Sequence, residues 1–201
     1  MSLLMLPLSI LALEEPPFDV LTTEGDFEIR QYQQHIAASV TARGNMDDAS
    51  SAGFRSIADY IFGNNQNTNT GQSEKISMTA PVSMRLPSSQ VVNQEQLNDD
   101  AQQWQVSFFM PAQYQLDTLP TPNNDQVRLE NIDAYFAAVI RFSGFTGTTK
   151  VEKKLALLQQ WIDAQQLTAK GTAHLARYNP PWTLPFLRRN EIIIHIRNPN
   201  T

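Results

Sequence analysis

Histidine is the side chain best suited to exchange protons near neutral pH, and the chain of 201 residues carries three: His35, His174 and His195. Each lies alone in a segment with strand-like alternation, outside the H-E-x-x-H spacing that brings two imidazoles to one metal ion. A metal site would require all three to converge from distant parts of the chain. We therefore interpret each histidine as an ordinary strand side chain.

Other catalytic motifs are missing from the sequence. The chain has no cysteine, which excludes thiolate nucleophiles, disulfides, thiolate haem ligands and Cys-based zinc sites. It also lacks a G-x-S-x-G elbow, a P-loop and a G-x-G-x-x-G fingerprint. The acidic pairs Asp47-Asp48 and Asp99-Asp100 are typical of helix starts and solvated loops. The sequence therefore favours a binding protein over an enzyme.

The charge balance limits the class of partner. Fifteen basic and twenty acidic residues give a net charge of −5, and the basic residues form no cluster. Nucleic-acid-binding surfaces usually show clustered Lys and Arg side chains. We therefore expect a monomer with a small-molecule partner and no nucleic-acid partner.

The first predicted helix carries aromatic side chains that suit binding. The segment from Asp47 to Gly63 begins with helix-start residues and ends on a helix-stop glycine. Within it, Phe54, Ile57 and Ile61 form one apolar stripe that an amphipathic helix would bury.

A second face of this helix carries Ser51, Arg55, Ala58 and Phe62, about a quarter turn from the stripe at 3.6 residues per turn. A surface helix has little reason to place a phenylalanine beside a cation. Two interpretations stay open. Phe62 packs beneath the following loop, or it forms an exposed apolar platform on which Arg55 meets an anionic group.

The chain contains an internal repeat. Residues 27–44 (FEIRQYQQHIAASVTARG) align with residues 127–144 (VRLENIDAYFAAVIRFSG), with apolar residues and a final glycine at matching positions. Such self-similarity indicates a duplication. We place the two halves at about residues 27–111 and 126–197.

Two further blocks follow in the same order. The helix around residues 54–61 aligns with residues 155–162, and MTAP at 78–81 aligns with YNPP at 178–181. The second helix has a capping-box pattern at its start, Thr149 to Glu152. Its apolar stripe consists of Val151, Leu155, Leu158 and Ile162.

Each half therefore has the order strand, helix, strand, strand, which predicts an α+β fold. The strands of the first half are expected at 27–42, 74–86 and 104–110. Those of the second half end at 172–178 and 191–196. Two such halves would place their sheets side by side or curl them into one barrel-like sheet, with two main helices related by a pseudo-two-fold axis.

The N-terminal segment Ser2–Leu13 (SLLMLPLSILAL) is apolar but too short to cross a bilayer as a helix. It resembles the apolar part of a secretory signal without the positive n-region. Residues 1–16 are thus either an arm packed on the domain or a signal remnant that could contact a membrane. The first alternative suits a cytoplasmic protein and the second an exported or membrane-associated one. Residues 17–201 form a single domain.

Four motifs together resemble the SOUL/haem-binding protein family. They are EIRQY at Glu28–Tyr32, GFRSIADYIFGNN at Gly53–Asn65, KISMTAPV at Lys75–Val82 and YNPPWTLPFLRRNEI at Tyr178–Ile192. The similarity runs from about Pro17 to Ile196. It implies duplicated βαββ units in a distorted antiparallel β-barrel or sheet flanked by two helices.

The resemblance also implies non-catalytic, non-covalent binding of haem or another tetrapyrrole, as a carrier or buffer. The proposed site in the family is a shallow apolar groove beside the first helix. Together with the second face of that helix, it gives the candidate binding residues Ser51, Phe54, Arg55, Ala58, Asp59 and Phe62.

The chain departs from the family where iron and propionates would be held. Some members carry a histidine directly before the tyrosine of the EIR-x-Y motif, and this position is Gln31 here. His35 is a weak substitute. The basic positions proposed to meet the propionates fall on Ser51 and Asp59, which leaves Arg55 as the nearest cation. We therefore expect a bound haem to lack a strong axial ligand and assign no metal-binding residue.

Two alternatives remain. The domain could bind another small amphipathic ligand in a cleft between the repeats, as the similar effector-binding domains of some bacterial regulators do. It could also be a small tetrapyrrole-modifying enzyme that uses His174 or His195, with Arg188 or Arg189 close in sequence. We expect the two arginines instead to fix a turn through hydrogen bonds to backbone carbonyls or to a carboxylate.

Overall fold

The computed structural model describes residues 13–87 and 93–199. Within these residues one large sheet is entirely antiparallel, in the order β1-β2-β9-β11-β10-β5-β6-β3-β8. Its strands are β1 (Phe18–Glu24), β2 (Phe27–Tyr32), β3 (His35–Arg43), β5 (Val82–Arg85), β6 (Gln103–Phe109), β8 (Arg128–Ile132), β9 (Tyr135–Phe142), β10 (Ala169–Arg177) and β11 (Asn190–Ile196).

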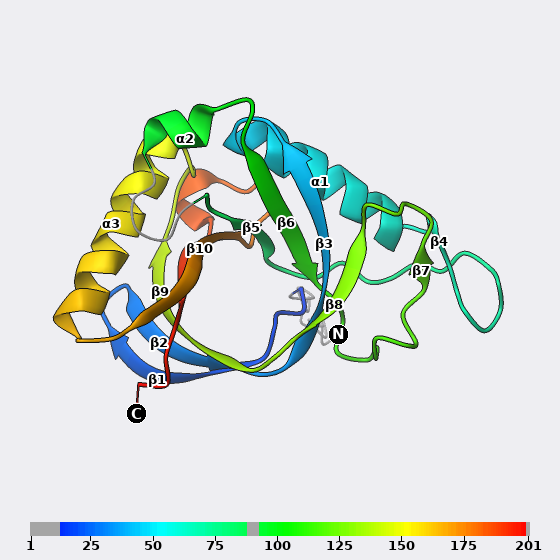
Figure 1. The fold of residues 1–201 in the computed structure, drawn as a ribbon, viewed down its shortest axis with the longest axis horizontal. Helices are drawn as coiled ribbons and strands as arrows, with labels where there is room; N and C mark the ends of the chain where they lie inside the picture. Colours follow the sequence, from blue (N-terminus) through cyan, green and yellow to red (C-terminus); the bar gives the residue numbers. More distant parts are fainter. Residues whose placement is uncertain (1–12, 88–92, 200–201) are drawn as a thin grey trace, which may run out of the picture.

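The helices are α1 (Met46–Ile61), α2 (Gln94–Asn98) and α3 (Thr148–Ala164), with a short 3₁₀ turn, η1, at Pro185–Leu187. The sheet curves around a central space, and α1 and α3 lie on its outer side (Figure 1). The strands at the two ends of the sheet, β1 and β8, do not pair with each other. The prediction of an α+β fold with an antiparallel sheet and two main helices is confirmed, and the sheet is open rather than closed into a barrel.

Alternation along the strands separates the two faces of the sheet, because successive side chains of a strand point to opposite sides. On β11, Ile192 and Ile194 enter the main core beneath the helices. Their neighbours Ile193 and His195 instead line a cleft on the concave side. The concave side therefore carries the polar and aromatic groups that could meet a ligand.

The order of the strands has the predicted pseudo-two-fold symmetry. Starting from the centre, β10 corresponds to β5, β11 to β6, β9 to β3 and β2 to β8. The first strand of each half pairs with the other half, since β2 pairs with β9 and β8 pairs with β3. This exchange joins both halves into one sheet.

Two details of the predicted repeat are wrong. The expected strand at 27–42 is two strands separated by Gln33-Gln34, and these strands lie in different parts of the sheet. The MTAP and YNPP blocks are not equivalent, because residues 78–81 precede β5 whereas residues 178–181 follow β10. The first error adds one strand before the helix of each half.

The helices differ from expectation mainly at their starts. Asn45 caps α1, and its side-chain oxygen accepts hydrogen bonds from the backbone N–H groups of Asp47 and Asp48 at 3.1 and 3.0 Å. The capping box expected in the second helix is absent, because α3 begins after Gly147 without a side-chain cap. The four residues of its predicted apolar stripe are all buried.

The stripe predicted for the first helix is partly wrong. Ile57 and Ile61 are buried, but Phe54 is 38% exposed. Gly53 occupies the buried position instead, where an added Cβ would lie 2.5 Å from Cβ of Val106 on β6. Because glycine has no side chain, α1 approaches the sheet closely at Gly53. Phe54 then lies at the edge of the contact between α1 and the sheet.

A smaller two-stranded sheet forms from the polar loops, where β4 (Asn65–Gln66) pairs with β7 (Thr121–Pro122). The expectation about Ser2–Leu13 falls almost wholly outside the described residues. The adjoining Glu14 contacts the domain, since its backbone carbonyl accepts from Ala80 N–H at 2.9 Å. Among the described residues, no helix is long and apolar enough to span a membrane.

Candidate binding sites

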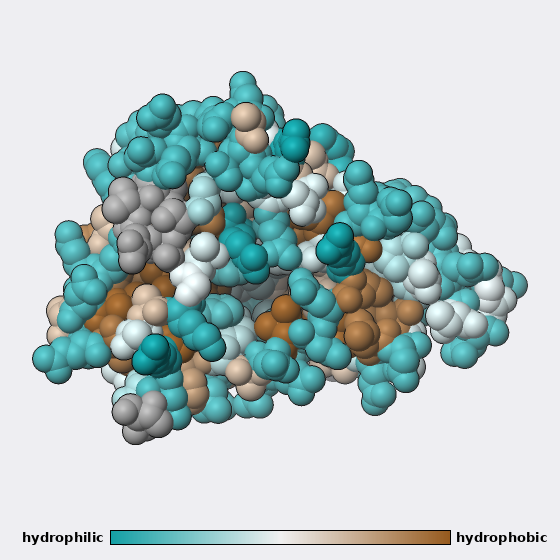
Figure 2. All heavy atoms as spheres, viewed as in Figure 1, coloured by the Kyte–Doolittle hydropathy of each residue, from teal (hydrophilic) through white to brown (hydrophobic). Residues whose placement is uncertain are grey.

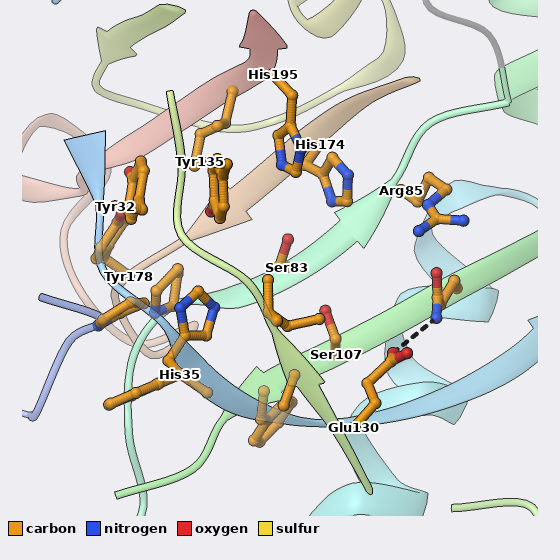
Figure 3. A pocket seen from close by; sticks show the side chains of 18 residues that line it. Tyr32, His35, Ser83, Arg85, Ser107, Glu130, Tyr135, His174, Tyr178 and His195 are labelled. Carbon is orange, nitrogen blue, oxygen red and sulfur yellow. Dashed lines mark hydrogen bonds between the residues drawn. The ribbon is translucent and has the colours of Figure 1, made fainter. Parts of the chain in front are cut away.

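A cleft of about 140 Å³ opens on the concave side of the sheet. Side chains from eight strands line it, from β2 and β3 in the first half of the chain to β10 and β11 at the end. The molecule is hollowed at its centre on this side, inside the curve of the sheet (Figure 2). Figure 3 shows the lining side chains.

The cleft exists because the middle of the sheet carries small side chains. Cross-strand pairing places Ala176 beside Ser83, Ser83 beside Ser107, and Ser107 beside Ser39. These four residues of β10, β5, β6 and β3 form a row in which no side chain is large enough to fill the space above the sheet. The hydroxyls of Ser83 and Ser107 lie at the centre of the view in Figure 3.

Four rings form a continuous stack along one wall. Tyr32 and Tyr135 stack with ring centroids 4.8 Å apart, and Tyr135 stacks on His195 at 3.9 Å. The His195 ring lies parallel to that of His174 at 5.4 Å. His35 lies beside the stack, with its ring 6.2 Å from that of Tyr135, and meets Phe109 edge to face at 5.7 Å (Figure 3). All three histidines of the chain therefore line one cleft.

The histidines are neutral at physiological pH. Burial, and then the nearby His195 and Arg85, lower the pKa of His174 to about 3. Burial, followed by the charges of Arg85 and Lys170, lowers the pKa of His195 to about 4. Burial also lowers the pKa of His35. No group of three His, Asp or Glu side chains in the described part of the chain is placed to share a metal ion.

Two charged groups flank the cleft. Glu130 accepts hydrogen bonds from the hydroxyl of Ser39 at 3.2 Å and from Gln105 at 3.5 Å. Arg85 lies opposite His174 in the pairing of β5 with β10. Within residues 13–87 and 93–199, the Arg85 guanidinium has no hydrogen bond or ion pair.

A buried ion network closes one end of the concave side. Arg30 makes a two-pronged contact with Glu191 at 2.8 and 2.9 Å, and Tyr178 donates its hydroxyl to the same carboxylate at 2.6 Å. Burial alone would raise the pKa of Glu191, but its contact with Arg30 and the charge of Arg189 outweigh burial and lower it. Glu191 is therefore an ionised residue already paired with cations, rather than a free charge for a ligand.

The arginines of the RRNE motif have structural roles, as expected from the sequence. Arg188 donates to the backbone carbonyls of Thr183 and Pro181. Arg189 binds Glu191 at 2.9 Å and Glu15 at 2.8 Å. These contacts hold the turn before β11 and weaken the alternative in which either arginine assists an enzyme reaction.

The candidate residues of the first helix lie on the other side of the sheet from the cleft. Exposed side chains are Ser51, Phe54, Arg55 and Asp59 on α1 and Phe62 at its C-cap, whereas Ala58 is 7% exposed. Phe62 is 56% exposed, which contradicts the interpretation that it packs beneath the following loop.

The outer face of α1 is an apolar surface with a cation beside it. The Phe54 ring packs at 5.6 Å from that of buried Phe108 and keeps an exposed edge. Arg55 has no hydrogen bond or ion pair to any described residue. Asp59 is occupied as an acceptor for Asn64.

The chain forms an α+β domain with a helix-covered outer side and a lined inner cleft. The chain belongs to the SOUL heme-binding protein family, whose family model matches residues 13–195. The comparison with curated proteins finds no match.

Solved structures share the fold at low identity. The C-terminal domain of EcmrR superposes with a TM-score of 0.61 at 10% identity, over 86% of this chain and 97% of that one. A hydrolase from Listeria innocua gives 0.61 at 11% identity, over 88% and 94%. The EcmrR–DNA complex gives 0.61 at 10% identity, over 86% of this chain and 57% of that one. At these identities the likeness shows the fold alone.

Proposed function

We propose that this protein binds haem or another tetrapyrrole, without catalysis, on the outer face of α1 and acts as a carrier or buffer. Membership of the SOUL heme-binding family supports the ligand class. The observation that carries the proposal is the exposure of two phenylalanines, Phe54 and Phe62, on one helix. An exposed apolar surface of this kind is a common mark of a binding site.

The spacing of the two rings suits a large flat ligand. Phe62, the C-cap residue of α1, lies eight positions after Phe54, which is about 12 Å along the axis. Ala58 lies between them and adds little height, so a macrocycle can lie across the helix. No described residue pairs with the Arg55 guanidinium, which is the group that would meet a propionate. Ser51 and Asp59 border the surface.

The position of the histidines leaves a tetrapyrrole on α1 without the usual iron ligand. All three histidines of the chain lie in the concave cleft, and the sheet separates them from α1. A tetrapyrrole on α1 would therefore be held by apolar contact and one cation. If about 500 Å² of apolar surface left water, the gain would be about 12 kcal/mol, against association costs on the order of 4 to 15 kcal/mol. We expect modest affinity with little dependence on iron.

Substitution of Phe62 tests the site. Phe62→Asp places a charge on the apolar surface and should weaken protoporphyrin binding at least about tenfold, since it removes apolar contact and repels propionates. The matched control is Leu157→Asp, because Leu157 is 45% exposed on the symmetry-related helix α3. Porphyrin fluorescence during titration measures both. Unchanged affinity in Phe62→Asp would show that the ligand lies elsewhere.

The second candidate function is binding of another small amphipathic ligand in the concave cleft. The stack of Tyr32, Tyr135, His195 and His174 supports it, because stacked rings provide a flat wall for an aromatic group. The two functions use opposite sides of the sheet and do not exclude each other.

A further inference from the structure

We propose that the concave cleft is a second binding site and that its ligand is a compact aromatic carboxylate whose ring lies along the four-ring stack and whose carboxylate meets Arg85. The inference specifies the second candidate function and is independent of tetrapyrrole binding on α1. It depends on the size of the cleft, on its unsatisfied polar groups and on its charge.

The size of the cleft selects a small ligand. A space of about 140 Å³ is close to the roughly 150 Å³ cavity that is known to take benzene. A tetrapyrrole is several times larger and could not be enclosed there. The row of Ala176, Ser83, Ser107 and Ser39 leaves the space shallow and flat above the sheet, which suits a single ring.

Several polar groups facing the cleft have no hydrogen-bond partner among the described residues. In the described part of the chain, neither the ring nitrogens of His174 and His195 nor the hydroxyls of Ser83 and Ser107 make a hydrogen bond. Each neutral imidazole has one N–H donor and one acceptor nitrogen, and each hydroxyl can both donate and accept. A ligand with oxygen acceptors would satisfy these groups, whereas a hydrocarbon would leave them unpaired.

The charges favour an anion. Arg85 is the one cation among the lining residues, and its guanidinium can hold a carboxylate in a two-pronged contact. It stands beside His174, at the end of the stack (Figure 3). Glu130, on the other wall, already accepts from Ser39 and Gln105. A carboxylate on the Arg85 side therefore gains an ion pair, whereas an organic cation would meet an unpaired guanidinium.

The chain offers a direct readout of this site. Its three histidines, His35, His174 and His195, all line the cleft. His35 also borders a neighbouring pocket, so the imidazole NMR signals of His174 and His195 are the ones that report binding in the cleft. The probes are benzoate, benzyl alcohol and benzylammonium, which share a ring and differ in charge. We expect benzoate to shift the signals of His174 and His195 and to bind about tenfold more tightly than benzyl alcohol, as one charge-assisted contact implies.

Two arginine variants separate the two sites. Arg85→Gln should abolish the preference for benzoate over benzyl alcohol, because Arg85 has no other described contact and its loss should not disturb the fold. Arg55→Gln on the outer face of α1 is the matched control and should leave benzoate binding unchanged.

Benzylammonium binding at least as tightly as benzoate, or an Arg85→Gln variant that keeps the preference, would overturn the proposal. Imidazole signals that no probe moves would also overturn it. None of these outcomes bears on protoporphyrin binding, which Phe62→Asp and Arg55→Gln test separately. Conversely, a protein that fails to bind protoporphyrin could still bind benzoate in the cleft.

Discussion

Arg30 and Glu191 form a buried ion pair, with Nη1 of Arg30 2.8 Å from Oε2 of Glu191 and both side chains almost fully shielded from solvent. Arg30 belongs to β2 and Glu191 to β11, with β9 between them. The pair thus links the EIRQY motif of the first half with the RRNE motif of the second. The ion pair therefore fixes β2, the first strand of the first half, to the second half at one end of the cleft.

Breaking this pair should destabilise the fold strongly. Arg30→Met leaves Glu191 with Arg189 and Tyr178 but without its two-pronged partner, and loss of one partner of a buried pair costs about 3 to 5 kcal/mol. Urea unfolding should show a lower midpoint at constant slope. The comparison is Lys154→Gln, which removes the surface pair with Asp26 at 3.7 Å and should cost less than about 1 kcal/mol. Equal effects of the two variants would contradict the central role of Arg30.

The close approach of α1 to β6 predicts an unusual response to alanine. Gly53→Ala normally favours a helix by about 1 kcal/mol, but here the new Cβ would lie 2.5 Å from Cβ of Val106. Overpacking of this kind typically costs about 1 to 3 kcal/mol. In a Val106→Ala background the same substitution should cost less, because the two obstructing methyl groups are gone and only Cβ of residue 106 remains close. A double-mutant cycle of unfolding free energies measures the coupling, and additive effects would contradict the contact.

The neutral histidines make stability depend on pH. In the unfolded chain their pKa is about 6.5, whereas the folded values are about 3 for His174 and about 4 for His195. Below about pH 6.5 the unfolded state therefore binds protons that the folded state excludes. The free energy of unfolding should be highest above this pH and fall as pH decreases toward 4, by up to about 1.4 kcal/mol per pH unit for each histidine.

Urea unfolding at about pH 7 and about pH 5 tests this, because carboxyl groups of the unfolded chain titrate mainly below that window. His174→Gln should reduce the pH dependence, since glutamine does not titrate. A wild-type protein equally stable at both pH values would show that the histidines are more accessible to protons than the cleft geometry implies.

Periodicity in the sequence predicts much of the fold. The stripe of α3 is buried as expected, because Val151, Leu155, Leu158 and Ile162 recur at helical spacing. The break at Gln33-Gln34 could not be predicted in the same way, since it contains no glycine or proline. The exposure of Phe54 depends on a close contact between Gly53 and Val106 that only the packed sheet reveals.

The two candidate sites differ in how far the sequence predicts them. The face of α1 was predicted because its residues follow one another along a single helix. The cleft was missed because His35, His174 and His195 come from three strands whose neighbours in the sheet are distant in sequence. Strand alternation does indicate that Glu191 and His195 share a face, but the pairing of β2 with β9 is needed to bring Arg30 and Tyr32 to them.

The most direct test of the proposed function is a parallel titration with haem and with metal-free protoporphyrin, followed by the Soret band and by porphyrin fluorescence. An apolar platform on α1 without an axial ligand predicts affinities for the two that agree within about tenfold, and a haem spectrum without histidine ligation. Strong preference for haem with a six-coordinate, histidine-ligated spectrum would contradict this account, because every histidine of the chain lies in the cleft on the other side of the sheet.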